Sequence, residues 1–510
     1  MRRWRRASVA GGLAAVLALA GCVPSGFHPA VAPRVPAADA LAHTAGAAPN
    51  GAWPAPDWVA QLRDPQLDQL VAEALRQNPD LQAAKARIDL AQAQLQQFAS
   101  LTGLTATAGA SVSKTRMPQS NDVANVSVGG YQVPVQLFGD PGVSPSSLFV
   151  ALNYQLDLWG RNAAATRGLL SMRDAARVDA EQARLTLSVA LVSLYCQLDQ
   201  AYALGDLLLE KQRASERITA VLRERAARGI DNGYDASDAA LKRNRLLAQI
   251  ALNDERMKLV ALQIGVMTGQ GPERGLSLRR PRPADLVDAP LPARLPVDLL
   301  GRRPDIVAAR LRVEAAYSTV DGTRAQFYPD VNLVAFGGLL ALTPASLLSH
   351  QALAGSIGPA VSLPIFDRGR LKAKLSGDVA SADVAIALYN KTVDEALGQV
   401  AQQLTSIATV DTLVAQQARS VDAAQRIVSI ADERHRRGLA MQKDIDLASL
   451  TLIDERTQLV DLQARRRMLR VGLVGALGGG FDASKVAGPP LTHFDVAFPS
   501  HDRLTDSHFD

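Results

Sequence analysis

The sequence is poor in the residues from which reactive sites and disulfide frameworks are made. Only two of its 510 residues are cysteines, Cys22 and Cys196, too few for a disulfide-stapled scaffold or a cysteine metal cluster. Aromatic residues make up 5% and charged residues 21%. The formal net charge of +5 includes four arginines within residues 2–6. A mature chain without them would be close to neutral, which gives no electrostatic case for binding nucleic acid.

Signature motifs of several enzyme classes are also missing. The sequence has no Gly-rich phosphate loop followed by Lys and Ser or Thr, no His-Glu-x-x-His and no Gly-x-Ser-x-Gly. Its seven histidines are scattered, and we expect Cys196 to pack as a small apolar residue. The sequence therefore predicts no enzyme activity, no metal site and no soluble cofactor. Energy for any transport would have to come from a partner.

The N-terminus has the features of a lipoprotein signal peptide over residues 1–21. Its apolar run over 9–20 is too short to span a bilayer. The Leu-Ala-Gly-Cys that ends at Cys22 resembles the bacterial lipoprotein box, so we expect Cys22 to carry an acyl lipid, with a free cysteine in an ordinary signal peptide as the alternative. Val23 follows, where an aspartate would favour the inner membrane, so we expect the outer membrane. Residues 22–52, rich in Pro and Ala, read as a lipidated tether.

The chain contains two copies of one unit. Three pairs of short segments recur at an offset of 209 positions, and a fourth pair upstream recurs at an offset of 225. The pairs are 156–161 with 364–370, Arg228-Gly229 with Arg437-Gly438, 267–269 with 476–478, and 78–81 with 303–306. We therefore expect a first repeat over 53–269, an inter-repeat segment over 270–302, a second repeat over 303–479 and a C-terminal tail over 480–510.

Each repeat contains two segments in which apolar residues alternate with small polar ones. The segments cover about 104–115 and 148–156 in the first repeat, and about 329–338 and 355–365 in the second. This alternation is typical of strands with lipid on one face and water on the other, although hairpins on a soluble core would look similar. Four strands cannot close a membrane barrel, so several chains would have to share one, and three chains would give twelve strands.

Two proline-free segments, about 160–228 and 369–437, predict very long helices. At about 1.5 Å per residue each would be about 100 Å long. Apolar residues in the second follow heptad spacing, so we expect shorter helices to pack along it. The predicted fold is mainly α with a membrane β part, built from a duplicated helix, β-hairpin, long helix and helix.

The segments that carry these landmarks resemble the outer membrane factor family, the TolC/OprM-like efflux lipoproteins, and within it the NodT-type branch of tripartite efflux systems. The resembling segments are 64–67, 78–81, 154–161, 295–305, 358–367 and 476–480. The resemblance implies a homotrimer in the outer membrane of a Gram-negative bacterium, with a twelve-stranded β-barrel that continues into a twelve-helix periplasmic α-barrel. Its partners would be outer membrane lipid, a periplasmic adaptor and an inner membrane transporter.

The resemblance also implies where passage is controlled. Family members close the periplasmic mouth with the two inter-helix turns of each chain, here around Gly229 and Gly438. The candidate gate residues are aspartates that trimer symmetry would arrange in rings: Asp235, Asp238, Asp444 and Asp446. The candidate adaptor-contact residues are Arg228, Gly229, Arg436, Arg437 and Gly438. Solvated acids at helix starts and basic residues at helix ends are the alternative interpretation.

The chain departs from the family pattern at the latch beside the second turn. Relatives often have a tyrosine three residues before the glycine and an arginine two residues after it. This chain has His435 and Ala440 at those positions. We expect a passive exit duct for drugs or other small toxic compounds. The alternatives are the duct of a type I protein secretion system and a lipid-tethered periplasmic coiled-coil scaffold.

Overall fold

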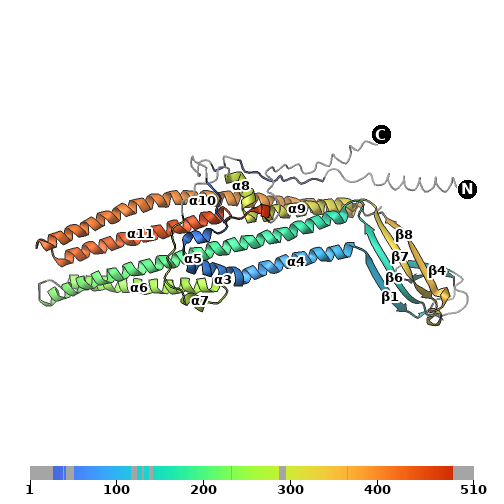
Figure 1. The fold of residues 1–510 in the computed structure, drawn as a ribbon, viewed down its shortest axis with the longest axis horizontal. Coiled ribbons are helices and arrows are strands. Elements are labelled where there is room, and N and C mark those ends of the chain that lie inside the picture. The colour runs from blue at the N-terminus through green and yellow to red at the C-terminus, as the bar shows by residue number, and fades with distance from the viewer. Residues whose placement is uncertain are drawn as a thin grey trace. The chain divides into compact units, whose positions relative to one another are not determined.

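A computed structural model describes residues 27–37, 40–41, 51–116, 123–128, 131–136, 142–230, 232–286, 295–363 and 366–485 (Figure 1). The expected signal peptide over 1–21, the expected lipidation site Cys22 and most of the tail over 480–510 lie outside the described residues. The chain divides into two compact units. The sheet unit comprises residues up to 32, 88–174 and 310–388, and the helical unit comprises 33–87, 175–309 and the residues from 389 on.

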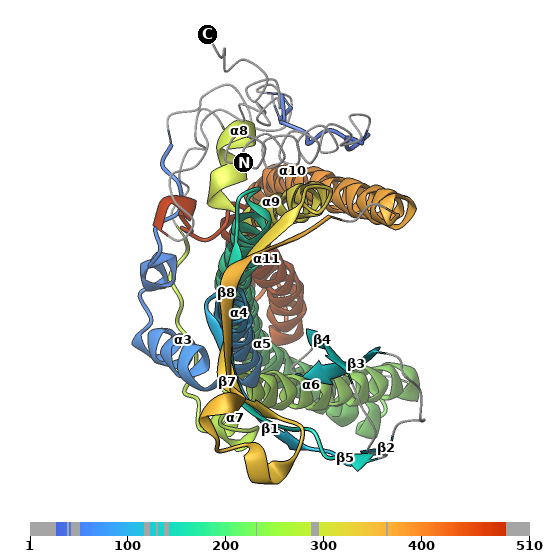
Figure 2. The same ribbon diagram turned by 90° about the vertical axis from the view of Figure 1, so that its right-hand side faces the viewer.

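The sheet unit is built on one four-stranded antiparallel sheet, which is curved in Figure 2. Its strands are β1 (Thr105–Val112), β6 (Ser146–Leu156), β7 (Asp330–Ala341) and β8 (Leu353–Ser362), in the order β1-β6-β7-β8. Strand β6 of the first repeat therefore pairs with β7 of the second. Two smaller pairs occupy the long hairpin loop of the first repeat: β2 (Thr115–Arg116) with β5 (Gly142–Val143), and β3 (Val123–Val128) with β4 (Tyr131–Gln136).

The register gives the sheet one apolar face and one face that mixes polar with apolar and glycine residues. Side chains alternate between faces along a strand, so residues that are paired across the sheet share a face. Rows of the apolar face are Ala108-Val150-Gly337-Gly355, Ala106-Leu152-Ala335-Ile357 and Tyr154-Leu333-Pro359. Rows of the opposite face are Thr107-Ala151-Phe336-Ser356 and Thr105-Asn153-Val334-Gly358. Many large apolar side chains of the first face are exposed, among them Val150, Tyr154, Leu333 and Ile357.

The helices follow the duplicated pattern. The first repeat has α3 (Pro65–Gln77), α4 (Pro79–Thr102), α5 (Arg161–Ala227) and α6 (Gly233–Met267), followed by the short α7 (Glu273–Leu276). The second has α8 (Leu295–Arg302), α9 (Pro304–Ala325), α10 (Arg368–Arg436) and α11 (Gln442–Ala476). Single 3-10 turns lie at Trp58–Leu62, Pro344–Ser346, His350–Ala352 and Ala483–Lys485. None of the helices in the described residues is long and apolar enough to cross a membrane.

Equivalent hydrogen bonds close the two repeats. Asn78 Nδ2 donates to the carbonyl oxygen of Met267 at 3.0 Å, and Arg303 Nη1 donates to that of Ala476 at 2.9 Å. The glycines that follow, Gly269 and Gly478, have φ angles of +78° and +91°. A Cβ atom on Gly269 would lie 2.5 Å from the carbonyl oxygen of Gln77, and one on Gly478 would lie 1.9 Å from that of Arg302. Only glycine therefore fits at these two positions. The duplication inferred from the sequence is therefore also a duplication of contacts.

The inter-repeat segment is tied to the core of the helical unit. Asp64 accepts a hydrogen bond from the backbone N–H of Gln66 at 3.0 Å and so caps α3. Gln66 bonds both the N–H and the C=O of Arg279, at 2.9 and 3.1 Å. The hydroxyl of Tyr195 donates to Asp64 at 2.7 Å. Burial and this carboxylate raise the pKa of Tyr195 well above its ordinary value. Cys196 beside it is buried, and burial raises the pKa of its thiol to about 12.

Candidate functional site

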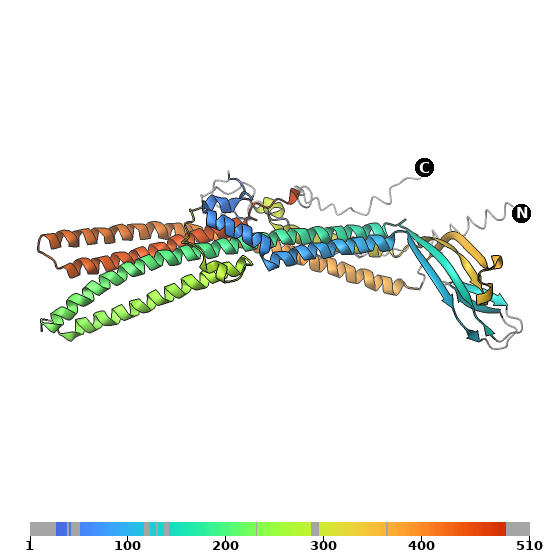
Figure 3. The ribbon, with the colours of Figure 1, turned by 60° about the horizontal axis from the view of Figure 1, so that its bottom comes forward.

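Both inter-helix turns have the same backbone geometry. In the first, Gly229 has a φ of +66° and Ile230 N–H donates to the carbonyl of Arg225 at 3.0 Å. In the second, Gly438 has a φ of +74° and Leu439 N–H donates to the carbonyl of Arg434 at 2.8 Å. A left-handed glycine with a bond back across the last turn is a common helix stop. Each turn therefore reverses the chain within a few residues, and Figure 3 shows the resulting helical hairpins α5–α6 and α10–α11.

The basic residues of the turns are exposed and paired with acids of their own helices. Arg228 pairs with Glu224, Arg437 with Glu433 at 2.7 Å, and Arg436 with Asp432 at 3.2 Å. Their side chains are 65–69% exposed, so these pairs are weak. Exposed apolar side chains stand among them: Ile230, Tyr234, Leu439 and Met441. The turns thus combine positive charge with apolar surface.

All four candidate gate aspartates lie near the beginnings of the helices that leave the turns. Asp235 is in the first turn of α6. Asp444 accepts the backbone N–H of Met441 at 2.8 Å and so caps α11. Asp238 forms an ion pair with Lys242 at 2.8 Å, and the hydrogen bond between them raises the pKa of Lys242.

The fourth candidate, Asp446, has a different environment. It is 2% exposed, and its Oδ1 accepts bonds from Arg217 of α5 at 2.7 and 2.9 Å. Asp446 therefore joins the two hairpins of one chain, whereas Asp444 two residues earlier caps its own helix. No local sequence pattern predicts this pair, because Arg217 lies in the other repeat. The gate role of all four aspartates stays a prediction.

His435 closes its own turn. Its Nδ1 lies 2.9 Å from the carbonyl oxygen of Ala440, which assigns the proton to Nδ1 in this contact. The two residues that depart from the family pattern at the latch thus contact each other.

Polar contacts join α5 to α11 along what we call the internal seam. Besides Arg217–Asp446, its ion pairs are Lys211–Asp454 at 2.5 Å, Glu210–Arg456 at 3.8 Å and Asp199–Arg467. Gln200 also donates to Asp461 at 2.7 Å. Arg467 lies between Asp199 and Asp285, and the hydrogen bond and the two charges raise its pKa against the opposing effect of burial. The internal seam therefore runs from the inter-repeat segment toward the turns.

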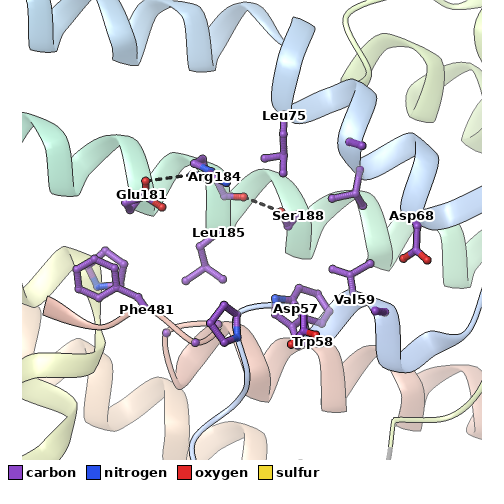
Figure 4. A pocket seen from close by; sticks show the side chains of 18 residues that line it. Asp57, Trp58, Val59, Asp68, Leu75, Glu181, Arg184, Leu185, Ser188 and Phe481 are labelled. Carbon is purple, nitrogen blue, oxygen red and sulfur yellow. Dashed lines mark hydrogen bonds and ion pairs between the residues drawn. The ribbon is translucent and has the colours of Figure 1, made fainter. Parts of the chain in front are cut away.

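The helical unit also contains a cavity of about 470 Å³, shown in Figure 4. It is lined by residues of α3, α5, the 3-10 turn at Trp58 and the Gly478–Gly480 loop. Glu181 and Arg184 form an ion pair at 3.2 Å, and the hydroxyl of Ser188 donates to the carbonyl of Arg184. No group of histidine, cysteine, aspartate or glutamate in the described residues could hold a metal ion. We assign the cavity no ligand.

Comparisons with known proteins agree with this architecture. The family model described as "Outer membrane efflux protein" matches residues 70–270 and 295–479. A putative multidrug resistance outer membrane protein, MdtQ of Shigella flexneri, is 30% identical over 467 residues, which cover 91% of this chain and 96% of MdtQ. The fusaric acid resistance protein FusA of Burkholderia cepacia is 34% identical over 373 residues, which cover 71% of this chain and 67% of FusA.

Solved structures are similar over nearly their whole length. The outer membrane protein VceC of Vibrio cholerae is 31% identical with a TM-score of 0.74, and the match covers 84% of this chain and 100% of VceC. The outer-membrane channel OprN is 25% identical with the same TM-score, covering 90% of this chain and 99% of OprN. The resemblance inferred from the short motifs is confirmed: this chain belongs to the outer membrane efflux protein family.

Proposed function

We propose that three copies of this chain form the exit duct of a tripartite efflux pump in the outer membrane. An inner membrane transporter would supply the energy and a periplasmic adaptor would connect it to the duct, which itself conducts passively and catalyses no reaction. Relatives named for multidrug resistance and for fusaric acid resistance support small toxic organic compounds as the cargo.

The two-faced sheet carries this proposal. Its apolar face suits lipid, and the polar side chains on its opposite face, such as Thr105, Thr107 and Asn153, suit water. Within the sheet, β1 and β8 are edge strands, and an edge in lipid would leave backbone groups without hydrogen bonds. Pairing β8 of one copy with β1 of the next removes every edge, and three copies then supply twelve strands.

The helical unit has surfaces that a neighbouring copy could cover. Helix α6 exposes Leu241, Leu252, Leu259 and Val266, which recur at helical spacing. Helix α10 exposes an open groove lined by Leu404, Thr405, Ala408, Thr409, Thr412, Leu413 and Gln416. Apolar stripes of this kind on long helices call for partner helices.

We propose an acyl anchor on Cys22 from the Leu-Ala-Gly-Cys sequence that ends there. In the sheet unit, the Val31 N–H donates to Asp383 of α10 at 2.9 Å. In the helical unit, Arg34 donates its backbone N–H to Asn390 at 2.7 Å and pairs with Asp394 at 2.9 Å. Val31 and Arg34 thus contact α10. Acyl chains on Cys22 would attach the chain to the membrane in addition to the sheet.

The turns are the surface that we propose for the adaptor. Arg228 and Arg437 pair with acids of their own helices, and these pairs are exposed, so an acidic partner could replace them at little cost. The apolar side chains among them would add buried area on binding.

Conductance and phenotype test the proposal together. Purified protein reconstituted in planar bilayers should conduct ions, and deletion of the gene should raise susceptibility to toxic compounds while the secreted proteins stay unchanged. A secretome that loses one protein, with unchanged drug susceptibility, would favour type I secretion instead. A lipid-tethered scaffold would give no conductance at all.

A further inference from the structure

The two long helices begin at the same end of the sheet, but the segments that begin them differ in charge. The end of β6, before α5, and the end of β8, before α10, both pair with the start of β7. At the offset of 209 positions, residues 157–165 correspond to 366–374. The first segment has one acid and one cation, whereas the second has one acid and four cations. These cations are Arg368, Arg370, Lys372 and Lys374. Since α5 begins without such a cluster, the fold of a repeat does not require it.

Contacts within the chain stabilise three of the four cations little. The beginning of a helix carries a partial positive charge, so Lys and Arg are unfavourable there. Arg370 pairs only with the acid three positions earlier, at 2.9 Å, and its side chain is 63% exposed, so the pair is weak. Among the described residues, Arg368 and Lys372 have no carboxylate partner. Lys374, by contrast, pairs with Asp378 at 3.0 Å. Arg368, Arg370 and Lys372 are therefore available to an anionic partner.

Aromatic side chains gather at the same end of the sheet. Phe366, just before α10, is 98% exposed. Trp159 stacks on Tyr328 with ring centroids 4.8 Å apart, and its Nε1 donates to the carbonyl oxygen of Pro329 at 2.8 Å. Tyr154 lies on the apolar face of the sheet and is exposed. Aromatic residues are enriched where a barrel meets the membrane surface. On the proposed function, in which the sheet lies in the membrane, this end of the sheet is thus at the membrane surface.

The N-terminal segment indicates the same boundary independently. Phe27 packs against a buried apolar cluster of α9 and α10, and its carbonyl oxygen accepts a hydrogen bond from Arg324 at 2.7 Å. Lys372 Nζ lies 5.8 Å from the centroid of the Phe27 ring. Cys22, the expected acylation site, precedes Phe27 by five residues, a length of chain that spans at most about 18 Å. An acyl chain on Cys22 would therefore enter the bilayer near the cations of α10.

We propose that Arg368, Arg370 and Lys372, together with Phe366, bind the headgroups of anionic phospholipids beside the acyl anchor. Guanidinium and ammonium groups pair with phosphate oxygens. The phenyl ring of Phe366 enters the boundary between headgroups and acyl chains. The preferred lipid is one with a net negative charge, such as phosphatidylglycerol, rather than zwitterionic phosphatidylethanolamine. This inference rests on the proposed function and adds a lipid class to it.

Native mass spectrometry of the full-length protein in detergent, with increasing amounts of added lipid, measures the affinity. The variant with Arg368→Gln, Arg370→Gln and Lys372→Gln removes the three charges. Each cation near an anionic bilayer raises the affinity by roughly fivefold, so the variant should bind phosphatidylglycerol on the order of 100-fold more weakly than wild type. Phosphatidylethanolamine with the same acyl chains should bind equally weakly to both proteins.

The matched control removes the same number of charges from the same helix. The variant with Lys391→Gln, Arg419→Gln and Arg426→Gln replaces three exposed cations farther along α10. It should bind phosphatidylglycerol as tightly as wild type, because these positions lie well beyond the end of the sheet.

Fluorescence tests the site in a bilayer. Phe366→Trp introduces a reporter, whose emission is taken as the difference from wild type. In vesicles of phosphatidylethanolamine, a minor fraction of brominated phosphatidylglycerol should quench this emission several-fold more strongly than the same fraction of brominated phosphatidylethanolamine. Adding the three glutamine substitutions should remove the difference.

Two results would overturn the inference: equal affinity of wild type for the two lipids, or equal affinity of wild type and the Arg368, Arg370 and Lys372 variant for phosphatidylglycerol. In either case, channels that still conduct leave the proposed function intact. If that variant does not assemble, the Phe366→Trp variant decides, and equal quenching by the two brominated lipids overturns the inference. A wild-type protein that conducts nothing would instead refute the proposed function, and this inference with it.

Discussion

Replacing the buried guanidinium of Arg303 should destabilise the helical unit strongly. The side chain is 6% exposed. It donates to both carboxylate oxygens of Asp305 at 3.0 and 2.6 Å, to Gln399 at 3.0 Å, and to the carbonyl of Ala476 at 2.9 Å. Arg303→Met keeps most of the volume and removes all four donations. This residue therefore joins the start of α9, the middle of α10 and the end of α11.

The contacts allow the size of the effect to be worked out. Breaking a buried charge pair costs about 3–5 kcal/mol, and a carbonyl left without its donor adds about 1 kcal/mol. Because Asp305 is 26% exposed, water will solvate part of its carboxylate, and we expect a net loss of about 3 kcal/mol. The matched control is Arg302→Met: Arg302 is 37% exposed and lies 3.4 Å from Asp482, so its loss should cost at most about 1 kcal/mol.

The free energy of unfolding of both variants can be measured by titrating the purified proteins with the denaturant guanidinium chloride. Circular dichroism of the helices follows the unfolding. The free energy of unfolding should fall by at least about three times as much for Arg303→Met as for Arg302→Met. Equal losses in the two variants would refute the reasoning, because the hydrogen bonds to Asp305, Gln399 and Ala476 would then contribute nothing beyond an exposed pair.

Three further predictions concern the gate, the sheet and the buried thiol. Asp444→Ala combined with Asp446→Ala should raise single-channel conductance, and unchanged conductance and ion selectivity would remove both from the gate. Gly338→Ala should lower the yield of folded protein, scored by heat-modifiable gel mobility, because its Cβ would lie 2.4 Å from a carbonyl oxygen of β6; Gly337→Ala, with open space around it, should not. Burial raises the pKa of Cys196 to about 12, so its thiolate is scarce at pH 8. Iodoacetamide should therefore label Cys196 only after the protein is unfolded. Rapid labelling of the folded protein would contradict this.

The helices could be predicted closely because their determinants are local. The expected helix over 160–228 is observed over Arg161–Ala227, and that over 369–437 is observed over Arg368–Arg436. An absence of proline, heptad spacing and a glycine at each end are enough to mark such a helix. Strands expected over 148–156 and 329–338 are observed over Ser146–Leu156 and Asp330–Ala341, since alternation is also a local signal.

Contacts between distant segments could not be predicted in the same way. Pairing of β6 with β7 joins the two repeats through residues about 180 positions apart, and no local pattern encodes such a register. The sequence predicts Asp446 as one gate residue among four, but its ion pair is with Arg217, 229 positions earlier. Comparison of the two repeats does distinguish Asp446 from the other positions. The equivalent residue in the first repeat is Ser237, so the acid occurs in the second repeat only.

Electron microscopy of the detergent-solubilised, full-length protein tests the central claim most directly. The account predicts class averages with three-fold symmetry around a central channel. Particles with a single copy and no channel would contradict it.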